Sequence, residues 1–107
     1  MPRRVSLTDE AIDDLGAIRG WQFQRGSGIA AKRRVKAILN TIEQLRRFPC
    51  LYARGDRPGT REVSSEGHRI IYVVDPDTGQ NADAGDVTVL RVFGPGQSRD
   101  SSGPIDE

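Results

Sequence analysis

The stretch Gly59–Asp75 constrains this chain more than any other. Its second half, His68–Asp75, has apolar residues on both faces of a strand, which is typical of a strand at the centre of a sheet. Residues 60–65 have the pattern of a shorter strand, and Glu66-Gly67 supplies the glycine that a two-residue hairpin turn favours. We therefore expect a β-hairpin at the centre of the fold.

Patterns before the hairpin predict one strand and two helices. Arg3–Leu7 alternates between polar and apolar residues, as a short strand does. Thr8 is suited to cap a first helix, which we expect over about residues 9–23. Apolar residues then recur at spacings of three and four, which predicts a second helix over about residues 29–48 that Pro49 ends.

After the hairpin, the composition changes twice. Residues 76–86 are rich in Pro, Gly, Asn and Asp and predict a long, mobile loop before a last strand at residues 87–93. From residue 94 to 107, Gly, Pro, Ser and Asp dominate, so we expect a flexible tail. Residues 1–93 are thus predicted to form one small α+β domain, with an antiparallel helix hairpin packed on an antiparallel sheet of about four strands and the N-terminal strand at an edge.

Composition narrows the classes of protein to which the chain can belong. Its 107 residues suffice for one modest core, and its single cysteine cannot form an internal disulfide. The first residues lack the apolar segment of a signal peptide, and no run has the length of a membrane span. We expect a cytoplasmic protein that does not associate with a membrane.

No motif specific to an enzyme, a metal or a cofactor is present. The lone thiol, Cys50, is expected to be a small buried apolar group, and the lone histidine, His68, a surface residue beside the turn. The carboxylates of the first helix are explained by the helix dipole; they are Asp9, Glu10, Asp13 and Asp14. We therefore expect no cofactor and name no catalytic residue from these side chains.

Arginine is the side chain that suggests recognition. Residues 19–69 contain twelve Lys or Arg and four Asp or Glu, whereas residues 73–107 contain two and seven. Arginines grouped near a sheet are suited to bind phosphate or a protein target, and Arg61 and Arg91 are expected to share one face of the sheet. The alternative is a solvated face with arginines paired to neighbouring carboxylates. The candidates for target or phosphate recognition are Arg57, Arg61, Arg69 and Arg91.

The order of elements, together with several short motifs, resembles the RelE/ParE superfamily of bacterial toxins from type II toxin–antitoxin modules. The resemblance covers about residues 3–93. It rests on Ala11, Asp14-Leu15, Ile18, Trp21, Leu45, Pro49, Gly59-Thr60-Arg61-Glu62, His68-Arg69-Ile70-Ile71-Tyr72 and Val89-Leu90-Arg91-Val92. It implies the fold described above and a cognate antitoxin as partner.

Two branches of the superfamily differ in activity. The RNA-cleaving RelE branch is similar at Arg69, which would be its catalytic residue, but basic residues of that branch are replaced here by Thr60 and Glu62, and no tyrosine follows Tyr72. The segment 59–62 resembles the ParE branch, which implies inhibition of DNA gyrase. The interpretation is a ParE-like gyrase inhibitor, with a ribosome-dependent mRNA endonuclease and a non-toxic module that binds only the antitoxin as alternatives.

The resemblance also suggests where an antitoxin would bind. Antitoxins of this class offer an amphipathic helix and an extended segment, which suit a helix hairpin and an open sheet edge. We expect the acceptor surface to include the first helix near Leu15, Ile18 and Trp21 and exposed parts of the second helix. The alternative is that these three residues belong to the core of the chain.

Overall fold

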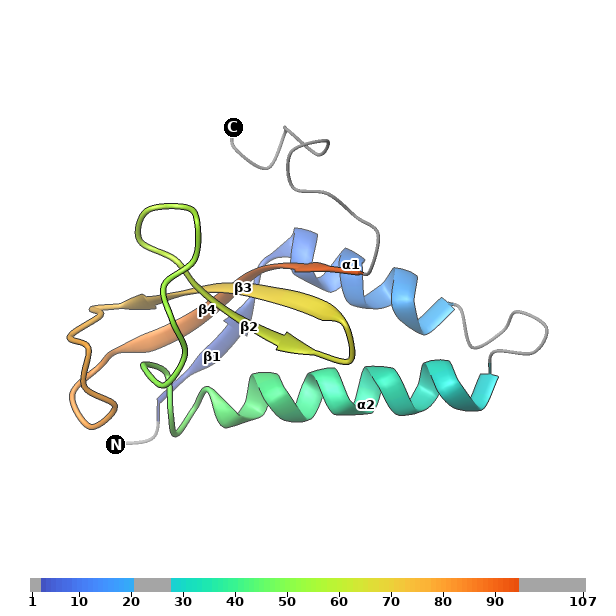
Figure 1. Cartoon of the computed structure of the whole chain (residues 1–107), viewed down its shortest axis with the longest axis horizontal. Helices are drawn as coiled ribbons and strands as arrows, with labels where there is room; N and C mark the ends of the chain where they lie inside the picture. Colours follow the sequence, from blue (N-terminus) through green and yellow to red (C-terminus); the bar gives the residue numbers. More distant parts are fainter. Residues whose placement is uncertain (1–2, 21–27, 95–107) are drawn as a thin grey trace.

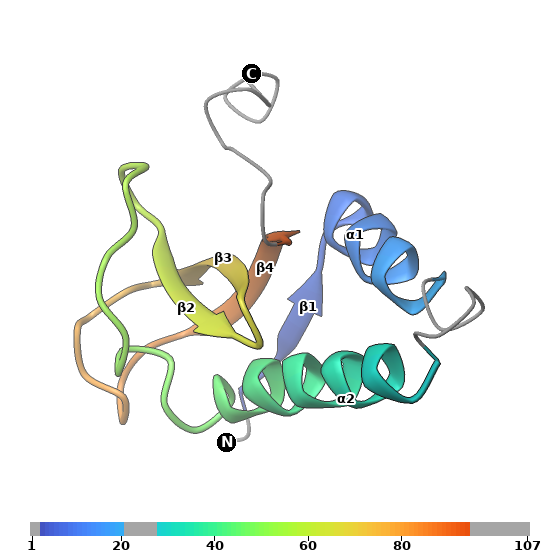
Figure 2. The ribbon, with the colours of Figure 1, turned by 45° about the vertical axis from the view of Figure 1, so that its right-hand side comes forward.

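Four strands form a single sheet in the order β1-β4-β3-β2, and two helices pack against it (Figures 1 and 2). The structure is a computed structural model, and it describes residues 3–20 and 28–94. In chain order, the elements are β1 Val5–Leu7, α1 Asp9–Gly20, α2 Gly28–Gln44, β2 Arg61–Ser65, β3 His68–Asp75 and β4 Asp86–Phe93. The predicted α+β domain with a helix pair on a sheet is confirmed.

The β2–β3 hairpin lies where the sequence predicts it. Ser65 pairs with His68, so Glu66 and Gly67 are the two residues of the turn. Their φ angles are 54° and 76°, and positive φ at both positions is what a type I′ turn requires. Strand β3 lies between β2 and β4, which explains why both of its faces are apolar.

The sheet is mixed because β1 runs parallel to its neighbour β4. The three strands of the meander are antiparallel, as expected, but the prediction of an antiparallel sheet does not hold for β1. Polar and apolar alternation indicates that a strand exists and which face is buried. The direction of its neighbour depends on where the two helices return the chain, which that pattern does not contain.

One irregularity in β4 determines which way its side chains point. Ile71 pairs with Arg91, yet the next residue, Tyr72, pairs with Val89, so Leu90 is an extra residue in the ladder. The bulge allows Val89 and Val92, three positions apart, both to be buried in the core with exposed fractions of 0% and 2%.

Both helices present the predicted apolar stripes to the core. The buried residues are Ala11, Leu15 and Ile18 from α1, Val35, Ile38 and Ile42 from α2, and Leu45 directly after α2. The hydroxyl of Thr8 accepts a hydrogen bond from the amide of Ala11 at 3.1 Å, so the predicted cap is present. The described part of α1 ends at Gly20, and the predicted extension over residues 21–23 lies outside the described residues.

Helix α2 ends at Gln44, four residues before the predicted end at Phe48. Three successive amides, those of Leu45, Arg46 and Arg47, bond to the carbonyl three residues back, which tightens the last turn. The Arg46 side chain then donates to the carbonyl of Arg3 at 2.6 Å, and the Arg3 guanidinium donates to the carbonyl of Arg46. This contact with the N-terminal strand region fixes the chain where the helix stops.

Residues 76–86, which the composition predicts to be a long, mobile loop, make hydrogen bonds with distant parts of the chain. Gly85 donates its amide to the carbonyl of Pro76 at 2.8 Å, and Ala84 is buried in the core with 8% exposure. Arg3 donates from Nε to the carbonyl of Gly85 at 2.8 Å. Long-range donors therefore satisfy a segment whose local composition suggested that it could not pack.

Neither described helix is long and apolar enough to cross a membrane.

Candidate functional site

A bidentate ion pair joins the start of β2 to the loop after β3. Arg61 donates from Nε to Oδ2 of Asp77 at 2.8 Å and from Nη2 to Oδ1 at 2.9 Å. Its remaining terminal nitrogen, Nη1, donates to the carbonyl of Tyr52 at 2.6 Å. Arg61 is 7% exposed, so the guanidinium is committed to contacts inside the chain.

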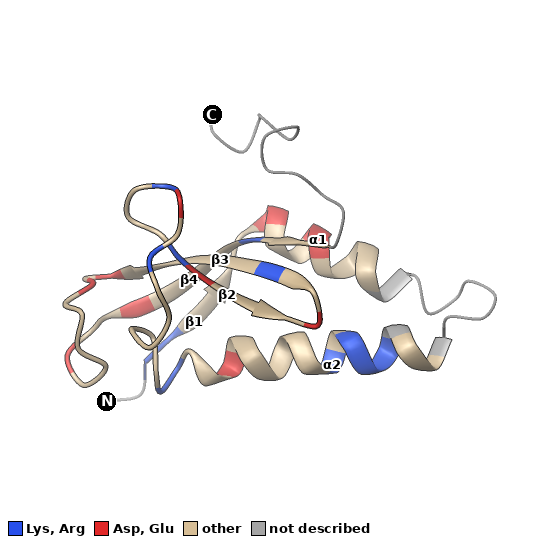
Figure 3. Cartoon of the chain, viewed as in Figure 1, with Lys and Arg blue, Asp and Glu red and all other residues tan. Residues whose placement is uncertain are grey.

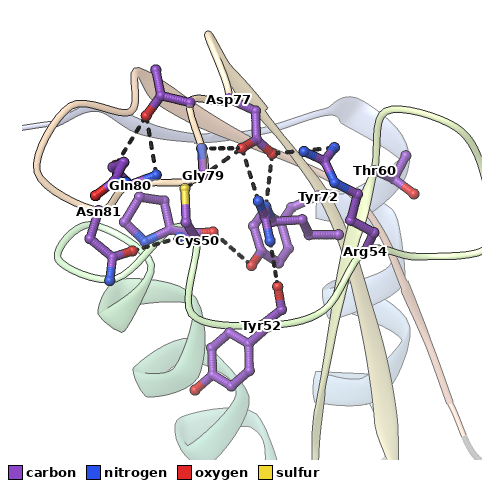
Figure 4. Close-up of polar contacts among 12 residues, drawn as sticks. Cys50, Tyr52, Arg54, Thr60, Tyr72, Asp77, Gly79, Gln80 and Asn81 are labelled. Atoms are coloured by element: carbon purple, nitrogen blue, oxygen red, sulfur yellow. Dashed lines mark hydrogen bonds and ion pairs between the residues drawn. The ribbon is translucent and has the colours of Figure 1, made fainter.

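Further polar contacts tie the two loops around this pair together (Figure 4). The Tyr72 hydroxyl donates to the carbonyl of Pro49 at 3.0 Å, and the Cys50 amide donates to Oδ1 of Asn81 at 2.7 Å. The Cys50 thiol lies 3.7 Å from Oδ1 of Asp77. Cys50 is half-buried and packs against the core. The loop after α2 and the loop after β3 are therefore held as one unit.

The pair strongly perturbs the titration of its members. Hydrogen bonds from Arg61 lower the pKa of Asp77 to about 2; burial opposes this shift, and the amide of Gly79 adds to it. The same hydrogen bond raises the pKa of Arg61. Burial raises the pKa of the Tyr72 hydroxyl, which remains a neutral donor. Arg61 and Asp77 therefore stay charged, and Tyr72 stays neutral, at neutral pH.

A second bidentate pair connects α1 to β4. Arg91 donates from Nε to Oδ2 of Asp14 at 2.8 Å and from Nη2 to Oδ1 at 3.0 Å. Asp14 also accepts the Val92 amide at 2.8 Å, and the Arg91 guanidinium lies 4.6 Å from the centroid of the Phe93 ring. Asp14 is thus more than a helix-dipole charge, because it satisfies an amide of β4.

Arg61 and Arg91 lie on opposite faces of the sheet, contrary to expectation. Arg61 pairs across the sheet with Tyr72, whereas Arg91 pairs with the adjacent residue Ile71. Cross-strand partners share a face and successive residues alternate. The bulge at Leu90 is what separates the two arginines, and no local signal in the sequence indicates it.

Arg69 is the most exposed of the four candidate arginines. Its side chain is 47% exposed and donates from Nη2 to Oε1 of Glu62 at 2.7 Å. Arg57 is half-buried in the loop before β2, and its carbonyl accepts the Thr60 hydroxyl at 2.7 Å. Arg61 and Arg91 are thus committed to carboxylates within the fold, while Arg69 remains at the surface in an ion pair.

His68 is fully buried, so its predicted surface position is wrong. Its Nδ1 lies 3.0 Å from the carbonyl of Glu66 in the hairpin turn. His68 lies on the same face of β3 as Ile70 and Tyr72, the face that packs in the core, so its side chain points into the chain and not out to solvent.

The residues predicted to contact an antitoxin occupy different environments. Leu15 and Ile18 are 6% and 3% exposed and belong to the core cluster. Trp21 lies outside the described residues. Exposed apolar side chains on the helices are Ile12, with 54% exposure, Ile29, with 78%, and Leu39, with 37%.

The described residues offer few groups of the kinds that commonly take part in catalysis. Within residues 3–20 and 28–94, no group of three or more His, Cys, Asp or Glu side chains is close enough to hold a metal ion. The ring of His68 has no surface exposed to solvent. What remains accessible is arginine, an ion pair on the sheet and exposed apolar residues on the helices.

Comparison with known proteins places this arrangement in a family. The model of the ParE toxin of the type II toxin–antitoxin system, parDE, matches residues 5–97. The chain belongs to this family. The predicted resemblance is therefore confirmed for this ParE-family chain.

Two solved structures share the fold. A chain of the chromosomal ParDE toxin–antitoxin system from P. aeruginosa superposes with a TM-score of 0.68 at 18% identity, covering 87% of this chain and 96% of that one. A chain of the RelBE2 toxin–antitoxin complex from Mycobacterium tuberculosis gives 0.60 at 21% identity, covering 88% and 99%. A search of curated proteins found no match.

Proposed function

We propose that this ParE-family chain is a toxin that binds a cognate antitoxin and, when free, inhibits DNA gyrase. The observation that carries the choice of target is the ion pair of Arg69 with Glu62 at 2.7 Å. RNA cleavage would depend on Arg69, and this arginine is already held by a carboxylate. A protein target therefore accounts better for the site than an RNA substrate.

The chemistry of RNA cleavage sharpens this choice. The reaction needs a group that activates the 2′-hydroxyl, a group that assists the leaving oxygen, and positive charge at the phosphate. The carboxylate of Glu62 offsets the charge of Arg69, and His68 beside it has no exposed surface. Among the described residues near Arg69, the positive charge is therefore offset, and the histidine is not exposed to activate the 2′-hydroxyl.

The proposed target contacts are Arg69 and Arg57. Arg69 keeps 47% of its side chain exposed although it is paired with Glu62, so a carboxylate of a protein target can share it. Arg61 and Arg91 are proposed to act indirectly, because their guanidinium groups hold Asp77 and Asp14.

The proposed antitoxin surface runs along the exterior of the helix pair. Ile12 and Leu39 are its exposed apolar residues, and Leu15 and Ile18 support it from the core. Trp21 remains part of the proposal. The neighbouring structures are described as ParDE and RelBE2 toxin–antitoxin systems, which supports an antitoxin as partner.

The test is a gyrase supercoiling assay with the purified chain and its Arg69→Ala variant. The proposal predicts inhibition by the wild type, relief when antitoxin is added, and inhibition weakened at least tenfold in the variant. Arg47→Ala, which removes an exposed arginine after α2, is the matched control and should inhibit like the wild type.

Other outcomes would select the alternatives. Unaffected supercoiling, together with mRNA cleavage on translating ribosomes that Arg69→Ala abolishes, would establish the endonuclease and refute the gyrase target. Unaffected supercoiling, intact mRNA and normal growth on expression would establish a module that only binds antitoxin.

A further inference from the structure

Three cations form an exposed ridge on α2, which we call the α2 ridge: Lys32, Arg33 and Lys36. All three side chains are exposed, and they lie in the blue part of α2 in Figure 3, which also contains the half-buried Arg34. The core residue Ile38 lies on the opposite side of the helix. The ridge is therefore convex and faces away from the sheet.

Within the described part of the chain, no carboxylate forms an ion pair with the α2 ridge. Arg46, Arg54, Arg61, Arg69 and Arg91 each lie within 4 Å of a carboxylate. No ion pair between described residues involves Lys32, Arg33 or Lys36, and α2 contains no Asp or Glu before Glu43. Positive charge therefore accumulates at this position.

Helix electrostatics oppose this placement. The ridge lies in the N-terminal half of α2, after its first turn and far from the C-terminal end where the helix dipole would favour cations. Lys32 and Lys36 are four positions apart and Arg33 and Lys36 three apart, so each pair is repulsive. Packing and capping do not explain these cations, whereas a bound polyanion would offset their repulsion.

We propose that the α2 ridge binds the phosphate backbone of duplex DNA. A duplex carries about one negative charge per 1.7 Å of its length, so it can meet three cations that span about 6 Å of helix. The major groove of a duplex is wide enough to admit an α-helix, so an exposed helix face can approach the phosphates that border it. This inference goes beyond the proposed function and does not depend on gyrase or on an antitoxin.

Fluorescence anisotropy tests the proposal with the full chain and a labelled duplex of mixed sequence, titrated at several salt concentrations. The test variant carries Lys32→Gln, Arg33→Gln and Lys36→Gln. The control carries Arg4→Gln, Arg47→Gln and Arg54→Gln, which removes the same charge from exposed sites elsewhere. Glutamine is a good helix former, so circular dichroism should show that α2 is retained.

We expect the test variant to lose at least tenfold in affinity at low salt, and the control less than threefold. Because each lost phosphate contact reduces the slope of log K against log salt by about 0.9, the slope should fall by about 2.7 in the test variant. Equal losses in both variants would overturn the proposal. So would a wild type that does not bind the duplex at 50 mM salt, a concentration at which about three contacts should be detectable.

An acidic peptide is the competing occupant, because exposed Ile29 adjoins the ridge and could contact apolar side chains of a peptide. Polyglutamate is therefore titrated as a competitor at the same charge concentration. Displacement of the duplex only at large excess supports the DNA assignment. Displacement at an equal concentration of charge overturns it in favour of an acidic protein partner.

Discussion

At the scale of single residues, the Arg61–Asp77 pair carries the largest energetic consequence. Arg61 is 7% exposed and the Asp77 side chain 13%, so neither charge is well solvated without the other. A buried pair adds little net stability compared with apolar residues, but removal of one partner leaves the other charge uncompensated. The pair is therefore best tested by neutralising one side.

Asp77→Asn should destabilise the chain by about 2–4 kcal/mol, somewhat less than for a fully buried pair, because the Arg61 charge loses its counter-ion. Urea unfolding followed by circular dichroism measures the loss. Asp83→Asn, at an exposed site in the same loop, is the control and should stay within about 0.5 kcal/mol of the wild type. A loss in Asp77→Asn no larger than in the control would show that the pair does not hold the loops.

Acid should unfold the chain partly through Asp77. Its pKa in the folded state, about 2, is below the ordinary value of 3.8, so the ionised form is favoured by folding. That stability is present above about pH 4 and is lost as the pH falls towards 2. The loss is on the order of 1–2 kcal/mol after solvent screening.

The measurement is the free energy of unfolding between pH 5 and 2, compared with that of Asp77→Asn over the same range. The difference in the free energy of unfolding between the wild type and the variant should become smaller as Asp77 is protonated. A constant difference between the two proteins down to pH 2 would contradict this assignment of the pKa.

At the scale of elements, Asp14 docks α1 onto β4. Strand β1 pairs with β4 only as far as Val89, and beyond it the amide of Val92 would face the edge of the sheet. Asp14 accepts this amide and also holds Arg91. One carboxylate thus completes the ladder and positions the helix.

Asp14→Asn should cost about 1–3 kcal/mol, because a charged acceptor of three donors is replaced by a neutral one. Hydrogen exchange at the Val92 amide should accelerate more than exchange at other amides of β4. Asp13→Asn, one residue away on the exposed side of α1, provides the comparison and should leave Val92 exchange unchanged. If the two variants behaved alike, Asp14 would act only through the helix dipole.

At the scale of the whole molecule, the proposed antitoxin surface and the proposed target contact at Arg69 are separable. The antitoxin surface uses Ile12 and Leu39 on the helices, whereas Arg69 lies on the sheet. A variant can therefore lose antitoxin binding and retain gyrase inhibition, or the reverse. Overlapping surfaces would not allow this separation.

Ile12→Asp combined with Leu39→Asp should weaken antitoxin binding at least tenfold, since two charges enter an apolar interface. Gyrase inhibition by the free variant should remain, but antitoxin should no longer relieve it. Leu51→Asp, 61% exposed in the loop after α2, is the control. Supercoiling assays with titrated antitoxin measure both the inhibition of gyrase and its relief by antitoxin. Full relief by antitoxin of the inhibition caused by the double variant would contradict the proposed surface.

The sequence by itself determined the elements and most of the core. Apolar spacing located both helices and the stripes at Leu15 and Ile38, and the apolar faces of residues 68–75 predicted the central strand. Thr8 predicted a cap, and Gly67 predicted the hairpin turn. These features arise from neighbours a few residues apart, so their physical causes are contained in short segments.

Only the tertiary structure decided what the charged side chains do. Asp14 meets Arg91 across 77 positions, and Asp77 meets Arg61 across 16. The parallel direction of β1 and the bulge at Leu90 likewise depend on where distant segments meet. Because a guanidinium's role is set by the acceptors within about 3 Å of it, composition could nominate the arginines but not separate those that hold the fold from those left at the surface.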